Sequence, residues 1–527
     1  MTADISFAPT HRPLLMAEAG MVVSGHPWAS AAGAAILRRG GNAMDAAVAT
    51  AATLAIAIPF MNGLGGDAMA LWGDASGKVT AINGSGRTPA AATVEHMRAL
   101  GLTRLPRRGP LSVSVPGVVA AWGQSLERFG TMQWTDVLAP AIHLAEAGVP
   151  LDRTAVKFFN GEEYAALTED FPDLGALFLT PGTASLGDRL RQPAAAQTLR
   201  ELAAQGWRGF YTDAVAAKWL PEARKAGVLL SSEDLAAHET LFADALAVAW
   251  MDRLVHVAPP NSQGIALLGM LGLKENGDEA ASAAIAGGID PAVFMRRKLA
   301  AFSIRDAYCS DPGRVRLPSV RLSAETFATL ERSARAPVAI TGGGDTSTLV
   351  VIDAAGNAVS WAQSLFEAFG SGVACPSSGI VLHNRMMMER LDDDPVRGLL
   401  PGKRPFHTLA PAMVTAGGRV DMAIATPGDH GQTQSLLQVL RQHYQAGLDL
   451  QAAIERPRLR HDAGELVKIE SRVPPEWRAA LKAAGWEVEE VGPWSRLMGG
   501  VNAIRRMPDG LLMGGADPRR ECYAVSA

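Results

Sequence analysis

The chain has 527 residues, of which 48% are hydrophobic and 19% are charged, and its formal net charge is −4. This composition is typical of a globular protein with a large core, built as two or more structural units or as one layered domain. The weak negative charge argues against nucleic acid or an anionic membrane surface as a partner. Three widely spaced cysteines, Cys309, Cys375 and Cys522, form no CxxC pair and give no support to zinc or redox chemistry.

The N-terminal region lacks targeting features and predicts two helices. The first residues have neither the basic nor the long apolar region of a secretory signal, which predicts a cytoplasmic protein. The segment SAAGAAILRRGGN (30–42) predicts an amphipathic helix that ends at two glycines, and Asn42 can cap the next helix. That helix, DAAVATAATLAIAIPF (45–60), is shorter than the roughly 20 residues that a membrane span needs, so we expect it to be buried in the protein.

The rest of the first half is predicted to contain more helix than strand. Two short strands are expected at AMALWGD (68–74) and GKVTAING (77–84). Helices are expected at GVVAAWGQSLERFG (117–130) and WTDVLAPAIHLAEAG (134–148), and SSEDLAAHE (231–239) has serine caps before acidic residues, which suits a helix start.

The second half contains more strands, and the change falls near residue 345. STLVVID (347–353), the turn AAGN and AVSWAQSL (358–365) predict a β-hairpin. Further strands are expected at GIVLHN (379–384), AMVTAGG with RVDMAIAT (412–426) and AIRRMPDGLLMGGA (503–516), and helices at 431–447 and 476–485. Helices interleaved with antiparallel strands predict a layered α+β fold.

A three-glycine loop, GGG (342–344), precedes the hairpin, and three interpretations compete for it. A phosphate-binding loop requires a strand before it, a helix after it and usually a GK[ST] ending, none of which is present. A plain surface loop explains the glycines without a function. Self-cleavage is the third interpretation, because a threonine hydroxyl can attack the preceding carbonyl when the backbone is strained, and glycines permit such strain.

Cleavage between Asp345 and Thr346 would leave Thr346 with a free α-amine. An N-terminal threonine combines a nucleophile and a base in one residue. The unperturbed pKa of an α-amine, roughly 7.7–8.0, is close to the working pH, as a general base requires. The local sequence alone leaves this interpretation beside the other two.

The wider sequence favours self-cleavage. In chain order it contains AAILRRGGNAMDAAVA, SVPGVVAAW, FGTMQWTDVLAPAIHLAEAG, FY with SSEDLAAHE, PPNSQG, the block around Thr346, PGDHGQ, ERPRLRH and ADPRR. With these motifs, the sequence from about Met21 to Tyr523 resembles the γ-glutamyltranspeptidase family of N-terminal-nucleophile hydrolases. The resemblance implies a four-layer αββα fold without a cofactor or metal. It also implies cleavage into a large subunit (1–345) and a small subunit (346–527) that assemble as a dimer of heterodimers.

The resemblance also implies the reacting residues. Thr346 matches the family nucleophile, and Ser364 matches a second hydroxyl that hydrogen-bonds near it. TPGDHG (426–431) matches the loop whose backbone N–H groups form the oxyanion hole, which gives Gly428 and Asp429 as donors. The family usually has a glycine where this chain has Asp429, and a carboxylate beside an oxyanion is unfavourable unless it points away or is neutralised.

The amino-acid recognition set of the transpeptidases is not kept. The arginine that grips the substrate α-carboxylate in the family corresponds to Ser85, with Arg87 two residues further on. The residues that hold the α-amino group correspond to Phe366, Arg385 and Met388, none of which accepts a hydrogen bond from an ammonium group. These differences argue against glutathione as the substrate.

A basic pocket replaces that set. Arg385, Arg87 and His407, with Thr408, are expected to bind a small anionic amide, because arginine binds carboxylates with two parallel hydrogen bonds. Within the superfamily the chain looks most like the oxamate amidohydrolase-type members. The segment 390–403 is short compared with the lid of many transpeptidases, which favours hydrolysis over transfer.

The sequence therefore predicts an autoprocessed threonine amidohydrolase. Two alternatives of the same class remain, a γ-glutamyl hydrolase or transpeptidase and a cephalosporin acylase, and so does an uncleaved binding protein without activity. His238, His383, His430 and His461 show no metal-ligand spacing and are expected to be structural.

Overall fold

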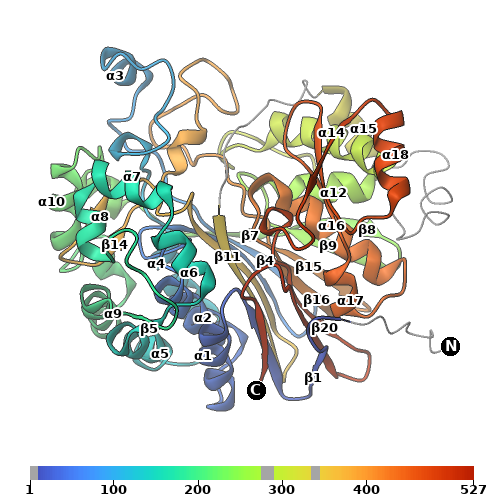
Figure 1. Cartoon of the computed structure of the whole chain (residues 1–527), viewed down its shortest axis with the longest axis horizontal. Coiled ribbons are helices and arrows are strands. Elements are labelled where there is room, and N and C mark those ends of the chain that lie inside the picture. Colours follow the sequence, from blue (N-terminus) through green and yellow to red (C-terminus); the bar gives the residue numbers. More distant parts are fainter. Residues whose placement is uncertain (1–9, 274–289, 334–344) are drawn as a thin grey trace.

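The fold is built around two β-sheets that draw strands from both halves of the sequence. The computed structural model describes residues 10–273, 290–333 and 345–527. Within these ranges the larger sheets have the strand orders β22-β2-β11-β12-β3-β4-β7 and β1-β21-β20-β16-β15-β9-β8-β10. The first sheet is antiparallel throughout, and the second has one parallel pair, β10 with β8. Figure 1 shows the strands in the middle of the molecule with helices on both sides.

The strands of the first sheet are β22 (Tyr523–Ser526), β2 (Gly20–Ser24), β11 (Asp345–Asp353), β12 (Ala358–Phe366), β3 (Asp67–Gly73), β4 (Val79–Gly84) and β7 (Leu241–Asp244). Those of the second are β1 (Leu15–Ala17), β21 (Leu512–Ala516), β20 (Asn502–Arg506), β16 (Arg419–Ala425), β15 (Ala412–Ala416), β9 (Arg253–Val257), β8 (Leu246–Trp250) and β10 (Arg321–Leu322). Smaller sheets pair β5 (Val149–Pro150) with β6 (Arg189–Leu190), β13 (Ala374–Cys375) with β14 (Ile380–Val381), and β17 (Leu459–His461) with β18 (Leu466–Glu470) and β19 (Glu487–Val491).

Helices lie on the outer side of each sheet (Figure 1). On the side of the first sheet these are α1 (Pro27–Arg38), α2 (Ala43–Ala57), α4 (Val118–Phe129), α5 (Trp134–Ala147), α6 (Arg153–Phe159), α7 (Glu162–Asp170), α8 (Pro172–Leu177), α9 (Pro193–Gln205) and α10 (Ala216–Lys225). On the side of the second are α12 (Gly264–Gly272), α14 (Pro291–Tyr308), α15 (Ala324–Ser333), α16 (Gln432–Tyr444), α17 (Leu450–Glu455) and α18 (Pro475–Ala483). The short helices α3 (Val94–Ala99) and α11 (Ser232–Ala236) complete the set in the described ranges.

Strand β11 shows why the central strands are apolar on both faces. Leu349 and Val351 contact the hydrophobic core beneath α2, whereas Val350 and Ile352 contact a separate core that includes Met413 of the second sheet. Side chains alternate across a strand, so a strand covered on both sides needs a continuous apolar run. The run TLVVI therefore fits a strand that lies between a helical layer and the facing sheet.

Helix α2 is the most buried helix next to β11. Every residue from Ala43 to Ala57 is buried, and the alanine-rich sequence allows α1 and the sheet to pack closely against it. Asn42 and Asp45 form a capping box at its start, as the sequence predicts for Asn42. The N–H of Ala43 also donates to Asp353 at the end of β11, at 2.9 Å.

The α+β prediction is confirmed by this mixture of helices and antiparallel sheets. Most predicted strands and helices are present, although GIVLHN forms only the two-residue strand Ile380–Val381. Most helices precede residue 345 and strands are more frequent after it, and each large sheet combines strands from both sides of this position. In the described ranges no helix is long and apolar enough to cross a membrane.

Candidate active site

Thr346 lies at the start of β11, opposite an irregularity in β12. Asp345 pairs with Phe366 and Ser347 pairs with Gln363, so the register shifts by one residue at Thr346. The extra residue is on β12, and Phe366 at its end has a left-handed φ of 77°. Bulges of this kind re-aim side chains next to active sites. Here the bulge brings Ser364 opposite Thr346.

The hydroxyl groups of Thr346 and Ser364 are in contact in the space between the two sheets. The Thr346 Oγ1 donates to Ser364 Oγ at 3.3 Å, and the Phe366 N–H donates to the same Ser364 oxygen at 2.7 Å. Thr346 is only 3% exposed. The structure therefore brings together the two hydroxyl residues that the sequence singles out, and it holds Ser364 as an acceptor for the threonine proton.

A buried amide network fixes the residues beside this pair. Asn62 Nδ2 donates to Ser347 Oγ at 2.9 Å, and Gln363 Nε2 donates to Asn62 Oδ1 at 2.6 Å. Gln363 Oε1 accepts from the indole N–H of Trp122 at 3.2 Å. In this series of buried hydrogen bonds each side chain bonds to the next, so the backbone around Thr346 has little freedom to move.

The Gly428–Asp429 loop has a backbone that few residues tolerate. Gly428 has φ 126°, and Asp429 has φ 52°, which is unusual for a residue with a side chain. Such strain persists where surrounding contacts over-determine it, and it is concentrated at functional sites. The loop opens α16, and its peptide groups are the oxyanion donors that the family resemblance implies.

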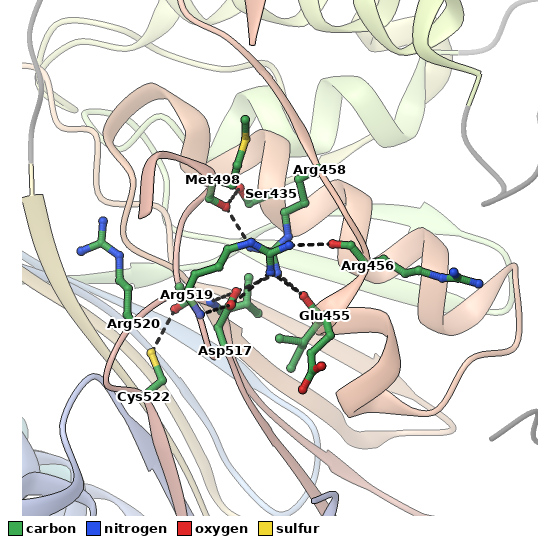
Figure 2. Close-up of polar contacts among 12 residues, drawn as sticks. Ser435, Glu455, Arg456, Arg458, Met498, Asp517, Arg519, Arg520 and Cys522 are labelled. Atoms are coloured by element: carbon green, nitrogen blue, oxygen red, sulfur yellow. Dashed lines mark hydrogen bonds and ion pairs between the residues drawn. The ribbon is translucent and has the colours of Figure 1, made fainter. Parts of the chain in front are cut away.

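A turn at 496–500 packs behind this loop. A Cβ on Gly428 would lie 3.4 Å from the Cα of Gly499, so the two backbones are in direct contact. The carbonyl of Met498 accepts from Ser435 Oγ at 2.9 Å and from Arg458 Nη1 at 2.8 Å, as Figure 2 shows. These contacts hold the turn in place against the loop.

A cluster of Arg458, Asp517 and Arg519 joins two of the sequence motifs behind the loop that a third motif forms. Arg458, from ERPRLRH, forms an ion pair with Asp517, from ADPRR, at 2.8 Å, and Arg519 pairs with the same carboxylate at 3.1 Å. All three side chains are buried, and Figure 2 shows the contacts between them. A buried arginine requires such partners, so these motifs support the loop that PGDHGQ forms.

Arg385 lies beside the hydroxyl pair in a buried ionic cluster. Asp67 stands directly opposite Ser364 in the pairing of β3 with β12, so the two side chains share a face of the sheet. The Arg385 Nε is 3.5 Å from Asp67 Oδ2, and the Phe366 ring lies 4.2 Å from the guanidinium carbon. Arg385 Nη1 is 3.4 Å from Thr408 Oγ1, and its Nη2 has no acceptor among the described residues.

Two histidines complete the cluster. His407 Nε2 is 3.1 Å from Asp67 Oδ2, and His383 Nδ1 is 3.6 Å from the same atom. Burial and, after it, the Arg385 charge lower the pKa of His407 to about 4, although Asp67 acts in the opposite direction. Burial also lowers the pKa of His383. Both imidazoles are therefore neutral near neutral pH and offer hydrogen bonds without charge.

The charge of the cluster comes from Asp67 and Arg385. Burial would raise the pKa of Asp67, but His383, His407 and Arg385 outweigh it and hold the carboxyl well below its usual range. Burial lowers the pKa of Arg385 to about 10, which still leaves it charged at neutral pH. Asp67 therefore balances the charge of the guanidinium. Phe366 covers one face of that group, so its Nη edge is the part that can donate hydrogen bonds to a ligand.

Arg87 does not join this cluster. Its Nη1 donates to the carbonyl of Gly402 at 2.9 Å, and in the described part of the chain no hydrogen bond or ion pair joins it to Arg385 or His407. Ser85, at the position of the family arginine, is buried and accepts from Asn261 Nδ2 at 3.1 Å. Of the four residues predicted to bind substrate, the structure thus groups Arg385, His407 and Thr408.

The segment between Arg390 and Lys403 is a closed loop. Lys403 Nζ pairs with Glu389 at the start of the loop and donates to the carbonyls of Val396 and Gly398, both at 2.8 Å. Both charged side chains are buried. These contacts join the two ends of the loop, so we expect the segment that follows Met388 to be rigid.

Sequence reasoning missed Asp67, Asn62 and Gln363. Asp67 follows two glycines in NGLGGDA, a pattern that marks a close backbone approach but does not name a partner. His383, expected to be only structural, contacts Asp67. These roles depend on residues far apart in the sequence, so no local spacing indicates them.

The whole chain is similar to a set of known proteins. The family model described as gamma-glutamyltranspeptidase matches residues 29–527. A glutathione hydrolase-like proenzyme of Bacillus subtilis is 35% identical, with 96% of this chain and 98% of that protein covered. The oxamate amidohydrolase proenzyme of Klebsiella pneumoniae is also 35% identical, with 95% and 97% covered.

A solved structure agrees with these relatives. The cephalosporin acylase of Bacillus halodurans superimposes with a TM-score of 0.88 at 29% identity, covering 100% of this chain and 99% of that one. The match of the family model over nearly the full length, together with relatives at 35% identity, settles the family. The chain belongs to the gamma-glutamyltranspeptidase family of N-terminal-nucleophile hydrolases, enzymes that act on amide C–N bonds.

Proposed function

We propose that this protein is an autoprocessed threonine amidohydrolase of four-layer αββα architecture. Cleavage between Asp345 and Thr346 gives a large subunit (1–345) and a small subunit (346–527), which remain together and assemble as a dimer of heterodimers. The contact between the Thr346 and Ser364 hydroxyls at the start of β11 is the observation that carries this proposal. The proenzyme names of the relatives are in line with such processing.

The proposed reaction uses Thr346 as both nucleophile and base. After cleavage its α-amine takes the Oγ proton while Oγ attacks the substrate carbonyl, and Ser364 accepts a hydrogen bond from the nucleophile. The N–H groups of Gly428 and Asp429 stabilise the oxyanion. Collapse of the tetrahedral intermediate expels ammonia or an amine, which takes the proton, and leaves an acyl-threonine ester. Water then attacks this ester and releases the carboxylic acid.

Arg385 supports a small carboxylate-bearing amide as the substrate. Its Nη edge is buried, and Nη2 lacks an acceptor among the described residues, so a substrate carboxylate would supply the missing hydrogen bond. Thr408 and neutral His407 lie beside this edge and can bind an adjacent carbonyl. Oxamate carries a carboxylate directly next to an amide, and one relative is named an oxamate amidohydrolase.

Asp67 and Asp429 favour a second candidate. Both carboxylates act on Arg385 electrostatically, and either could accept a hydrogen bond from a substrate ammonium group. A γ-glutamyl compound carries such an ammonium beside a carboxylate, and one relative is named glutathione hydrolase-like. An acylase activity on cephalosporin side chains is the third candidate, because that activity is named for the superimposed structure.

A comparison of substrates tests the proposal. Ammonia release from oxamate and p-nitroaniline release from γ-glutamyl-p-nitroanilide and glutaryl-p-nitroanilide are measured with wild-type protein and with Arg385→Ala. We expect the higher kcat/KM for oxamate in the wild type and its loss in Arg385→Ala. A higher kcat/KM for the γ-glutamyl anilide would favour a γ-glutamyl hydrolase in place of an oxamate amidohydrolase. A higher kcat/KM for the glutaryl anilide would favour the acylase activity. No Thr346-dependent turnover of any of the three would contradict the amidohydrolase proposal.

A further inference from the structure

Gln263 joins the two sides of the candidate site through one side-chain amide. It lies in PPNSQG, immediately before α12, and is fully buried. Its Nε2 donates to the carbonyl of Thr408 at 2.6 Å and to the carbonyl of Asp429 at 2.8 Å. Thr408 belongs to the Arg385 side of the site, and Asp429 belongs to the oxyanion loop. One side-chain amide therefore connects the two sides of the site.

The backbone of Gln263 is itself fixed. Its N–H donates to the carbonyl of His407 at 2.9 Å, and the His407 N–H donates to the carbonyl of Asn261 at 2.9 Å. Its Oε1 accepts from Arg305 Nη1 at 3.4 Å, and the same Arg305 nitrogen is 3.1 Å from His430 Nδ1. The side chain that spans the site is thus held at both ends.

The bond to Asp429 acts on the strained part of the loop. Asp429 has a left-handed φ of 52°, and its own N–H is one of the two proposed oxyanion donors. A left-handed residue with a side chain requires contacts that hold it in place. The bond from Gln263 holds the peptide that follows Asp429, and so restrains the strained residue on the side opposite its N–H.

The amide nitrogen of a glutamine has two N–H groups, and Gln263 uses one for each carbonyl. Both carbonyls belong to buried residues. A residue of similar length without N–H donors at position 263 would remove the hydrogen bond that each of these buried carbonyls accepts from Gln263. The effect would fall on the geometry of the oxyanion loop rather than on the nucleophile.

We propose that Gln263 is a positioning residue that aims the Asp429 N–H at the oxyanion of the reaction. This inference rests on the proposed function in one respect only, the assignment of Thr346 and the 428–429 peptides to the reaction. It does not depend on the identity of the acyl group. A probe that needs the nucleophile and the oxyanion donors, but not the Arg385 pocket, therefore tests it independently.

The probe is p-nitrophenyl acetate, an activated ester with a minimal acyl group. The burst of p-nitrophenolate on acylation is measured with cleaved wild-type protein and with Gln263→Met and Gln263→Glu, with Thr346→Ala as the background. Methionine keeps the length without donors, and glutamate keeps the shape but accepts where glutamine donates. Gln438→Met is the matched control, because the buried Gln438 also donates to two carbonyls, Gln434 at 3.1 Å and Leu459 at 2.9 Å, within α16 and beside it.

We expect both Gln263 variants to fold and to acylate about tenfold to hundredfold more slowly, because loss of an entire oxyanion donor costs about 100- to 1000-fold in kcat. The concentration of ester at half-maximal rate should change less than about threefold, and Gln438→Met should acylate at the wild-type rate. Equal acylation rates in wild type and both Gln263 variants would overturn the inference alone, as would failure of both variants to fold. A wild type without a Thr346-dependent burst would overturn the proposed function and, with it, this inference.

Discussion

Replacement of Asp67 by asparagine should destabilise the protein strongly, because it leaves Arg385 as a buried cation without its balancing charge. Asp67 is within 3.6 Å of Arg385, His383 and His407, and all four side chains are fully buried. Removal of one partner of a buried ion pair costs about 3–5 kcal/mol. We therefore expect Asp67→Asn to lower the free energy of unfolding by about that amount at pH 7.

A double-mutant cycle separates the ion pair from the packing. Arg385→Met removes the opposite charge at similar length, and the two variants are combined in one chain. The pKa of His407 is lowered partly by Arg385, so without that charge His407 can protonate more readily and pair with Asp67. We expect Arg385→Met to lower the free energy of unfolding less than Asp67→Asn does. The loss in the double variant should be smaller than the sum of the two single losses by about 2 kcal/mol or more.

Equilibrium denaturation in urea, followed by circular dichroism, provides these free energies. All variants carry Thr346→Ala, so that cleavage does not complicate the reference state. The pair Glu389 and Lys403, buried in the loop beside the site, gives a control cycle for an ion pair outside the cluster. Losses for Asp67→Asn and Arg385→Met that add within about 0.5 kcal/mol would refute the account of a coupled cluster.

Three further predictions concern the site and its charges. Ser364→Ala should fold but cleave and turn over about tenfold to hundredfold more slowly, because a hydrogen bond to a charged or partly charged group, such as the attacking Thr346 hydroxyl, contributes about 1.5–3 kcal/mol. Gel analysis and initial rates measure the two steps, and unchanged rates would make Ser364 structural. Arg385→Lys should raise KM for oxamate and Arg385→Ala should raise it further, because lysine keeps the charge without the planar fork, and an unchanged KM in both would exclude Arg385 as the carboxylate ligand. The pKa of His407, His256 and His443 is lowered to about 4 by burial, so the unfolded state takes up protons first and the melting temperature should fall as the pH falls from about 6.5 to 4; a constant melting temperature over this range would contradict the burial of neutral histidines.

Local patterns predict the elements that carry the nucleophile. The β-branched run after Asp345 and the turn AAGN predict the hairpin β11–β12, and Asn42 predicts the start of α2. These features follow from propensities and caps that act over a few residues. The pairing of Thr346 with Ser364 follows from the register of that hairpin and its bulge.

The ionic cluster behind Ser364 could not be predicted in the same way. Asp67, His383, Arg385 and His407 come from three segments that are far apart in the sequence, and the fold brings their side chains together beside β12. Arg87 follows β4, the strand that pairs with β3, yet its side chain donates to the carbonyl of Gly402. Spacing along the chain gives no information on such choices, which depend on where each buried charge finds a partner.

The central claim is that Thr346 becomes the N-terminal residue of a second chain. Purified wild-type protein is separated under denaturing conditions, and both the intact masses and the N-terminal sequences of its fragments are determined. The account predicts two fragments, residues 1–345 and 346–527, the second beginning TSTLVV, with Thr346→Ala remaining one inactive chain. A wild-type protein that is fully active as a single uncleaved chain would contradict it.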